Sequence, residues 1–115
     1  MSLENTLKDI GLDAMAGEVG LLSLHDGDPG GTGTNELSGG APAYARKTPT
    51  WAAASGGSVD LSNSPVFDVP AGATVAHVGF WSADGSTWYG SDPVTNEVYG
   101  DQGTYTVNSG SISIS

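Results

Sequence analysis

The spacing of hydrophobic positions changes after Gly17. Residues 2–16 carry apolar side chains at helical intervals, which predicts one helix with the stripe Leu3, Leu7, Ile10 and Ala14. Ser2 is expected to cap this helix and Gly17 to end it. The pattern allows two positions for the stripe. It packs on the helix's own domain, or it docks as an arm on a neighbouring subunit, since an isolated helix this short is marginal in water.

Beyond Gly17 the apolar residues form short or alternating runs, as β-strands do. Residues 19–25 predict a buried strand. Residues 71–83 predict the most regular strand, with Val75, His77, Gly79 and Trp81 on one face and Ala76, Val78 and Phe80 on the other. Residues 83–85, Ala-Asp-Gly, predict a hairpin turn with a return strand at 86–91. Further extended segments are expected at 43–54, 57–63, 64–70, 95–100, 103–108 and 111–115.

About seven to nine short strands with frequent turn signals indicate an all-β fold. We expect a single small β-sandwich or barrel of antiparallel strands with a short N-terminal helix. Residues 1–17 form the helix or arm and residues 18–115 the β-sandwich, as one globular domain overall. The composition agrees, because 18 glycines in 115 residues suit a chain with many tight turns.

The formal net charge of −10 excludes some partners. Such a chain repels phosphate backbones and anionic lipid surfaces, so we predict no nucleic acid and no membrane as partners. The sequence has no cysteine, which excludes disulfides and Cys-ligated zinc, and leaves oligomerisation as one route to extra stability. No segment resembles a signal peptide, so we expect synthesis in a cytoplasm.

The stretch HDGDPGGTGTNELSGG, residues 25–40, invites comparison with ligand-binding loops. Aligned on an EF-hand loop, Asp26 and Asp28 fall at positions 1 and 3, yet Gly30 stands at position 5 and Leu37 at position 12, where carboxylates or amides are needed. A phosphate-binding loop would need a Lys-Ser/Thr pair after its glycines. We therefore predict no metal and no cofactor, and treat the loop as a turn-rich surface.

Side chains that could support catalysis lack the context that catalysis needs. His25 and His77 are the two histidines, and no G-x-S-x-G nucleophile elbow occurs. We predict that the protein is not an enzyme. Trp81, Trp88 and Tyr89 flank one hairpin, where they form part of the core or, if exposed, a platform for sugar or protein.

Two of the three basic residues, Arg46 and Lys47, are adjacent. Arginine suits a bidentate contact with a carboxylate. This carboxylate belongs either to an acidic partner or to residues 25–40 of the same chain, called the acidic loop below. The spacing of the residues leaves both alternatives open.

Several of these motifs together resemble small virion proteins of tailed bacteriophages, especially those infecting actinobacteria. The shared pattern comprises Leu24-His25, Asp28-Pro29, Thr32-Gly33-Thr34-Asn35-Glu36, Gly39-Gly40, Tyr44-Ala45-Arg46 and Trp51. The later stretches FDVPAGATVAHVGFWSA and GTYTV are similar too. Members are described as minor capsid, minor tail or tail-fibre-like proteins, so the resemblance implies a structural virion component without catalysis.

From this resemblance we expect a capsid decoration or minor capsid protein on the outer surface of the head. It would bind the phage major capsid protein, as a homotrimer, and stabilise the shell. The alternative is a tail-tip or tail-fibre-like protein that contacts host surface glycan. The candidate partner contacts are Asp26, Asp28, Asn35, Glu36, Tyr44, Arg46 and Lys47.

Overall fold

The structure, a computed structural model, describes residues 4–107 and 111–113. Helix α1 (Asn5–Glu18) comes first, and seven strands follow within these residues. They are β1 (Leu21–His25), β2 (Ser58–Asp60), β3 (Val66–Val69), β4 (Thr74–Trp81), β5 (Trp88–Val98), β6 (Gly103–Thr106) and β7 (Ser111–Ser113).

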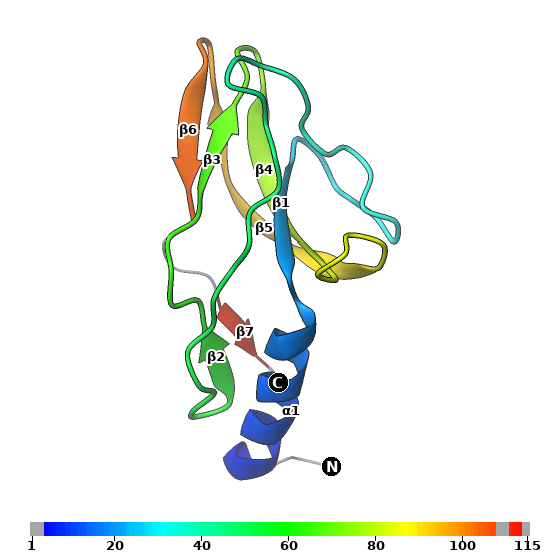
Figure 1. The fold of residues 1–115 in the computed structure, drawn as a ribbon, viewed down its shortest axis with the longest axis vertical. Coiled ribbons are helices and arrows are strands. Elements are labelled where there is room, and N and C mark those ends of the chain that lie inside the picture. Colours follow the sequence, from blue (N-terminus) through cyan, green and yellow to red (C-terminus); the bar gives the residue numbers. More distant parts are fainter. Residues whose placement is uncertain (1–3, 108–110, 114–115) are drawn as a thin grey trace.

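The strands form separate antiparallel sheets, and no closed barrel is present among the described residues. The largest sheet has the order β1-β4-β5, while β2 pairs with β7 and β3 with β6. Figure 1 shows β3 and β6 beside the three-stranded sheet, and β2 and β7 near α1 at the lower pole. The predicted all-β character with a short N-terminal helix is confirmed.

The β4–β5 hairpin is where the alternation was most regular, and the turn forms where the sequence places it. Asp84 accepts hydrogen bonds from the hydroxyl of Ser82 at 2.6 Å and from the backbone N–H of Ser86 at 3.0 Å. These bonds lower the pKa of Asp84 to about 2, and the bond from the Ser82 hydroxyl has the largest effect. The sequence predicted separate strands at 86–91 and 95–100, and this was wrong, because β5 runs unbroken from Trp88 to Val98.

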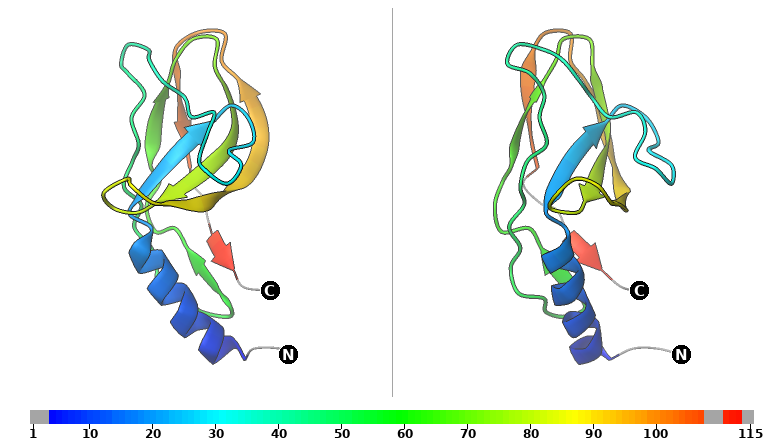
Figure 2. Two further views of the ribbon diagram at one scale, coloured as in Figure 1. Left: turned by 90° about the vertical axis from the view of Figure 1, so that its right-hand side faces the viewer. Right: turned by 45° about the vertical axis from the view of Figure 1, so that its right-hand side comes forward.

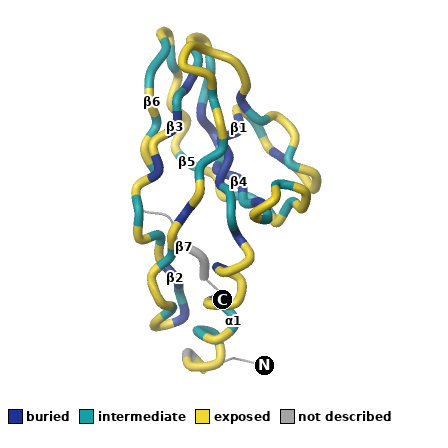
Figure 3. Tube along the Cα trace, in the orientation of Figure 1, coloured by how far each residue is buried: buried dark blue, intermediate teal, exposed yellow. Residues whose placement is uncertain are grey.

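The main core lies between β3 and the three-stranded sheet. Phe67 and Val69 of β3 are fully buried and pack in one cluster with Leu22, Leu24 and Val78. Figure 3 shows most of the buried positions on β1 and β4, whereas β5 is largely exposed.

Val75 belongs to the same cluster as Val78, although strict alternation assigns it to the face of Trp81. The register against β5 shifts between Val75 and His77, and this irregularity interrupts the alternation.

Helix α1 packs on its own domain through a different face from the predicted one. Leu12 and Ala16 are buried against Val59, whereas Leu7 is 54% and Ile10 64% exposed. The helix carries apolar residues on two opposite faces, and the predicted stripe is not the one that packs on its own domain. Its second alternative, docking on a neighbouring subunit, stays a prediction. Figure 2 shows α1 extending below the three-stranded sheet, with one side open.

The ends of α1 also differ from the prediction. Its N-cap is Glu4, without a side-chain hydrogen bond, and the helix runs one residue past Gly17 to Glu18. The predicted cap Ser2 and the stripe residue Leu3 lie outside the described residues. Among those described, no helix has the length and apolar character needed to span a membrane.

The segment 43–54 is extended but forms no named strand. It makes isolated bridges, of Lys47 with Leu22 and of Trp51 with Leu61. Leu22 donates to the Lys47 carbonyl at 2.8 Å and Lys47 donates back at 3.1 Å, so the segment follows the edge of β1. This contact brings the Tyr-Ala-Arg-Lys stretch beside the acidic loop.

Candidate functional site

The acidic loop folds back along the strand from which it emerges. Asp26 donates its backbone N–H to the carbonyl of Asn35 at 3.0 Å, and Leu37 donates to Leu24 at 3.0 Å. A bridge between His25 and Glu36 lies between these two bonds. The loop therefore forms a hairpin-like extension of β1, and Figure 2 shows it projecting from the side of the molecule.

His25 anchors this loop from beneath. Its side chain is 0% exposed, and Nδ1 lies 2.8 Å from the carbonyl of Thr34. Because a carbonyl can only accept, Nδ1 carries the proton and Nε2 accepts from the hydroxyl of Ser23 at 2.7 Å. Burial lowers the pKa of His25, which keeps the ring neutral.

Ser23 connects His25 to Trp81, which forms an aromatic pair with Trp88. The indole N–H of Trp81 donates to the Ser23 hydroxyl at 2.9 Å, so this hydroxyl both accepts and donates within the buried network. A serine hydrogen-bonded to histidine resembles a nucleophile and its base. However, Ser23 and His25 are both 0% exposed, so no substrate reaches either group in this structure.

Glu36 is held by two side chains from the Tyr-Ala-Arg motif. Arg46 donates from Nη2 to Oε1 at 2.8 Å and from Nε to Oε2 at 2.9 Å, and Tyr44 donates to Oε2 at 2.8 Å. Burial alone would raise the pKa of Glu36, but the bonds from Arg46 and Tyr44 outweigh it and the pKa is lowered. The same bond to Glu36 raises the pKa of Arg46.

Tyr44 also stabilises the strand. Its hydroxyl accepts the backbone N–H of Leu24 at 2.9 Å, while its ring stacks on Phe67 with centroids 6.3 Å apart. Burial raises the pKa of Tyr44 far above its ordinary value, so the phenol stays protonated and can donate to Glu36.

The tryptophans lie under the loop and do not form an open platform. Trp81 is 9% exposed and packs edge-on against Trp88 with ring centroids 4.9 Å apart. The guanidinium of Arg46 lies 3.9 Å from the Trp81 ring centroid, in cation–π geometry. A Cβ added to Gly33 would lie 2.7 Å from Trp81 and 2.8 Å from Trp88, so a glycine lets the loop approach both rings.

The turns of the loop are stabilised from within. Asp28 accepts the N–H of Gly30 at 2.9 Å, and its carbonyl accepts the side-chain amide of Asn35 at 3.1 Å. Asn35 has a φ of 63°, a left-handed conformation that asparagine adopts more readily than most residues. No group of three or more metal-ligating side chains occurs among the described residues.

The partner-contact candidates thus fall into two sets. Glu36, Tyr44 and Arg46 come together in the internal network just described, which answers the question left open for Arg46. Asp26, Asp28 and Asn35 are exposed on the loop, and Lys47 is half-buried beside β1. Whether any of them contacts a partner stays a prediction.

Other members of this cluster had weaker signals in the sequence. Ser23 was not singled out, although residues two apart on a strand share a face and Ser23 precedes His25 by two. Gly79 was placed on the face of the 71–83 strand that carries His77 and Trp81, but no role was predicted for it. It is needed there because a Cβ would lie 2.6 Å from Trp88 and 2.7 Å from the Nε2 of His25.

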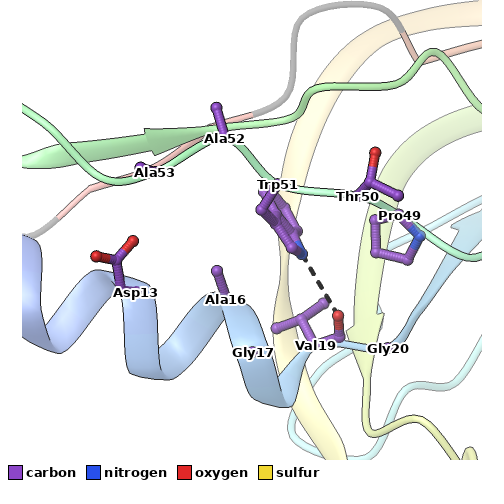
Figure 4. A pocket seen from close by; sticks show the side chains of 10 residues that line it. All are labelled: Asp13, Ala16, Gly17, Val19, Gly20, Pro49, Thr50, Trp51, Ala52 and Ala53. Atoms are coloured by element: carbon purple, nitrogen blue, oxygen red, sulfur yellow. Dashed lines mark hydrogen bonds between the residues drawn. The ribbon is translucent and has the colours of Figure 1, made fainter.

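A second feature is a groove of about 470 Å³ at the junction of α1 and the segment 49–53. Figure 4 shows the indole of Trp51 on one side, with its N–H directed to the carbonyl of Val19 at 3.4 Å. Asp13 is the titratable side chain in its lining, and Oδ1 of that residue already accepts the N–H of Ala54 at 2.8 Å. The lining of the groove therefore provides an apolar surface with few polar groups that could bind a ligand.

Small antiparallel sheets thus carry a sealed polar network and a fastened surface loop. Comparison with known families gives the class of protein. A family model described as "Podophage GP4 fiber I protein gp80" matches residues 4–115, and the chain belongs to this family. No curated protein and no solved structure matches the chain.

This membership confirms the resemblance to tailed-phage virion proteins, while the expected actinobacterial host stays a prediction. The chain is thus a phage structural component. Between the two positions expected from the sequence, a fibre family favours the tail-fibre alternative over capsid decoration.

Proposed function

We propose that this protein is a non-enzymatic subunit of a podophage tail fibre. The observation that carries the proposal is the match of residues 4–115 to a fibre protein family. The role is mechanical: the domain presents a shaped surface at a fixed distance from the point where it attaches.

The shape of the molecule supports this role. Its principal extents are 46 × 27 × 26 Å, so it is elongated. Figure 1 shows α1, β2 and β7 at one pole, and the turns that join β3 to β4 and β5 to β6 at the other. We assign the pole with α1 to attachment and the opposite pole to the host.

The turns at the host pole are connected to each other. Gln102 accepts the backbone N–H of Ala41 at 3.3 Å and donates its amide to the carbonyl of Pro42 at 3.2 Å. Gly40 has a φ of 95°, and a Cβ there would lie 3.1 Å from Pro70. Loops joined in this way keep their shape when they meet a surface.

The sealed Ser23–His25 pair supports a role without catalysis. An active nucleophile has to reach its substrate, and these two side chains are 0% exposed. For host contact we propose a surface glycan as the ligand. The contact does not use Trp81 and Trp88, because the loop and Arg46 cover that pair.

The test is to locate the protein on intact virions. Virions labelled with gold-conjugated antibody against the protein should carry label at the fibres in electron micrographs. Quantitative mass spectrometry should give a copy number per virion that matches the number of fibre subunits. Label distributed over the head, with hundreds of copies per virion, would overturn the proposal in favour of capsid decoration.

A further inference from the structure

Helix α1 has two apolar faces, and the β-structure covers one of them. Leu12 is 0% and Ala16 5% exposed, and both pack with Val59. On the other face Leu7 is 54% and Ile10 64% exposed, and Ala14 is exposed as well. At about 100° per residue, Leu7, Ile10 and Ala14 fall within about 60° of one another and opposite Ala16.

The spacing of the open face is that of a helix–helix seam. Leu7, Ile10 and Ala14 are separated by three and then four residues, which is the alternation of a and d positions in a coiled coil. A narrow stripe of this kind accepts the matching stripe of another helix, whose side chains insert between its own. No charged residue interrupts it.

Two hydrogen bonds prevent the helix from turning its open face inward. Asp9 accepts the backbone N–H of Gly57 at 2.9 Å, and Asp13 accepts that of Ala54 at 2.8 Å. Both carboxylates lie on the side of Leu12 and Ala16. Rolling the helix to bury Ile10 would break both bonds and expose Leu12.

We propose that the stripe of Leu7, Ile10 and Ala14 is a self-association surface that packs against α1 of a second copy of this chain. The same heptad positions on both helices make the contact self-complementary, as a two-fold symmetric interface requires. Copies that each carry −10 repel one another, and a stripe without charged side chains is where two of them can meet at the lowest electrostatic cost. The inference does not depend on whether the protein sits on the fibre or on the head.

The contact is weak in dilute solution. Helix α1 has 14 residues, so it is about 21 Å long, and two such helices bury less than the roughly 1,200–2,000 Å² of a stable interface. Copies held side by side on a virion reach effective concentrations near the millimolar range, at which a weak contact forms. Solution experiments therefore need concentrations up to about one millimolar.

Sedimentation equilibrium of the whole protein tests this inference. We expect concentration-dependent association that strengthens when salt is raised, because salt screens the repulsion between acidic copies. Ile10→Asp should weaken association at least tenfold while the circular dichroism spectrum and the thermal midpoint stay as in the wild type. The same experiment gives the number of copies in the assembly.

Val98→Asp is the matched control, since Val98 is 75% exposed on β5 and is also a single apolar side chain exposed to solvent. It should associate like the wild type. The inference is overturned if the wild type stays monomeric at about one millimolar, if Val98→Asp weakens association as much as Ile10→Asp, or if rising salt dissociates the assembly.

Discussion

Arg46 binds both carboxylate oxygens of Glu36, at 2.8 and 2.9 Å, across ten residues of chain. The pair is only partly exposed, at 28% for the arginine side chain and 21% for the glutamate. It joins the segment 43–54 to the end of the acidic loop, and the guanidinium covers the ring of Trp81. One contact therefore fixes the loop, the segment 43–54 and the aromatic pair with respect to each other.

Removing Arg46 should destabilise the domain. Arg46→Ala leaves Glu36 with only the bond from Tyr44 and uncovers Trp81, and we expect a loss of about 2 kcal/mol in the free energy of unfolding. Urea denaturation followed by tryptophan fluorescence measures it. The charge-swapped pair Arg46→Glu with Glu36→Arg should recover part of the loss. A stable Arg46→Ala variant that fails to enter virions would instead assign Arg46 to a partner.

The stability of the fold should fall in mild acid. The pKa of His25 is lowered in the folded state, chiefly by burial, so between that value and the ordinary pKa of about 6.5 the unfolded chain binds more protons. This contribution is complete above about pH 6.5 and declines as pH falls through the folded pKa. The lowered pKa of Glu36 adds a second loss below about pH 4.5.

Urea midpoints between about pH 8 and pH 5 should therefore decrease for the wild type. His25→Gln should flatten this decrease, because glutamine does not titrate. Equal slopes in the wild type and His25→Gln would show that protonation of His25 does not govern acid stability.

Gly79 should not accept a side chain. A Cβ there would contact the Ser23 hydroxyl and would lie 2.6 Å from Trp88 and 2.7 Å from the Nε2 of His25. We expect Gly79→Ala to cost about 3 kcal/mol, measured by thermal unfolding, because the buried network has to move. Gly31→Ala should be close to neutral, since a Cβ there meets no atom within 4 Å. A tolerated Gly79→Ala would contradict the packing described here.

The attachment of α1 should depend on two acids. Asp9→Ala and Asp13→Ala each remove the acceptor of a backbone N–H on the segment 54–57, and each should cost about 0.5–1 kcal/mol. Amide hydrogen exchange would show faster exchange at Gly57 and Ala54. Glu18→Ala removes the same charge from an exposed position on α1 and should leave both rates unchanged.

The sequence predicted those parts of the fold that local patterns determine. The extended segment at 64–70 and the turn at 83–85 each depend on a short stretch of sequence, and both form where they were predicted. The packing of the predicted α1 stripe on its own domain was wrong, because amphipathic spacing shows that a stripe exists and does not show which of two stripes the domain covers.

The candidate site needed information that lies far apart in the chain. The pairing of Arg46 with Glu36 depends on how the segment after the loop returns along β1, which the bridge between Lys47 and Leu22 determines. The sequence supplied the right residue types there and left their partners undecided. The motifs that resemble phage virion proteins contain these same residues. In the structure they bond to one another, as in the contacts of His25 with Thr34 and of Glu36 with Tyr44 and Arg46.

The fastenings of the acidic loop lie at its base, in His25, Thr34 and Glu36, while Gly30, Gly31 and Thr32 at its crown are exposed. The base is therefore fastened independently of the crown, and a short peptide inserted at Gly31, where no atom lies within 4 Å of an added Cβ, should leave the frame of the loop in place.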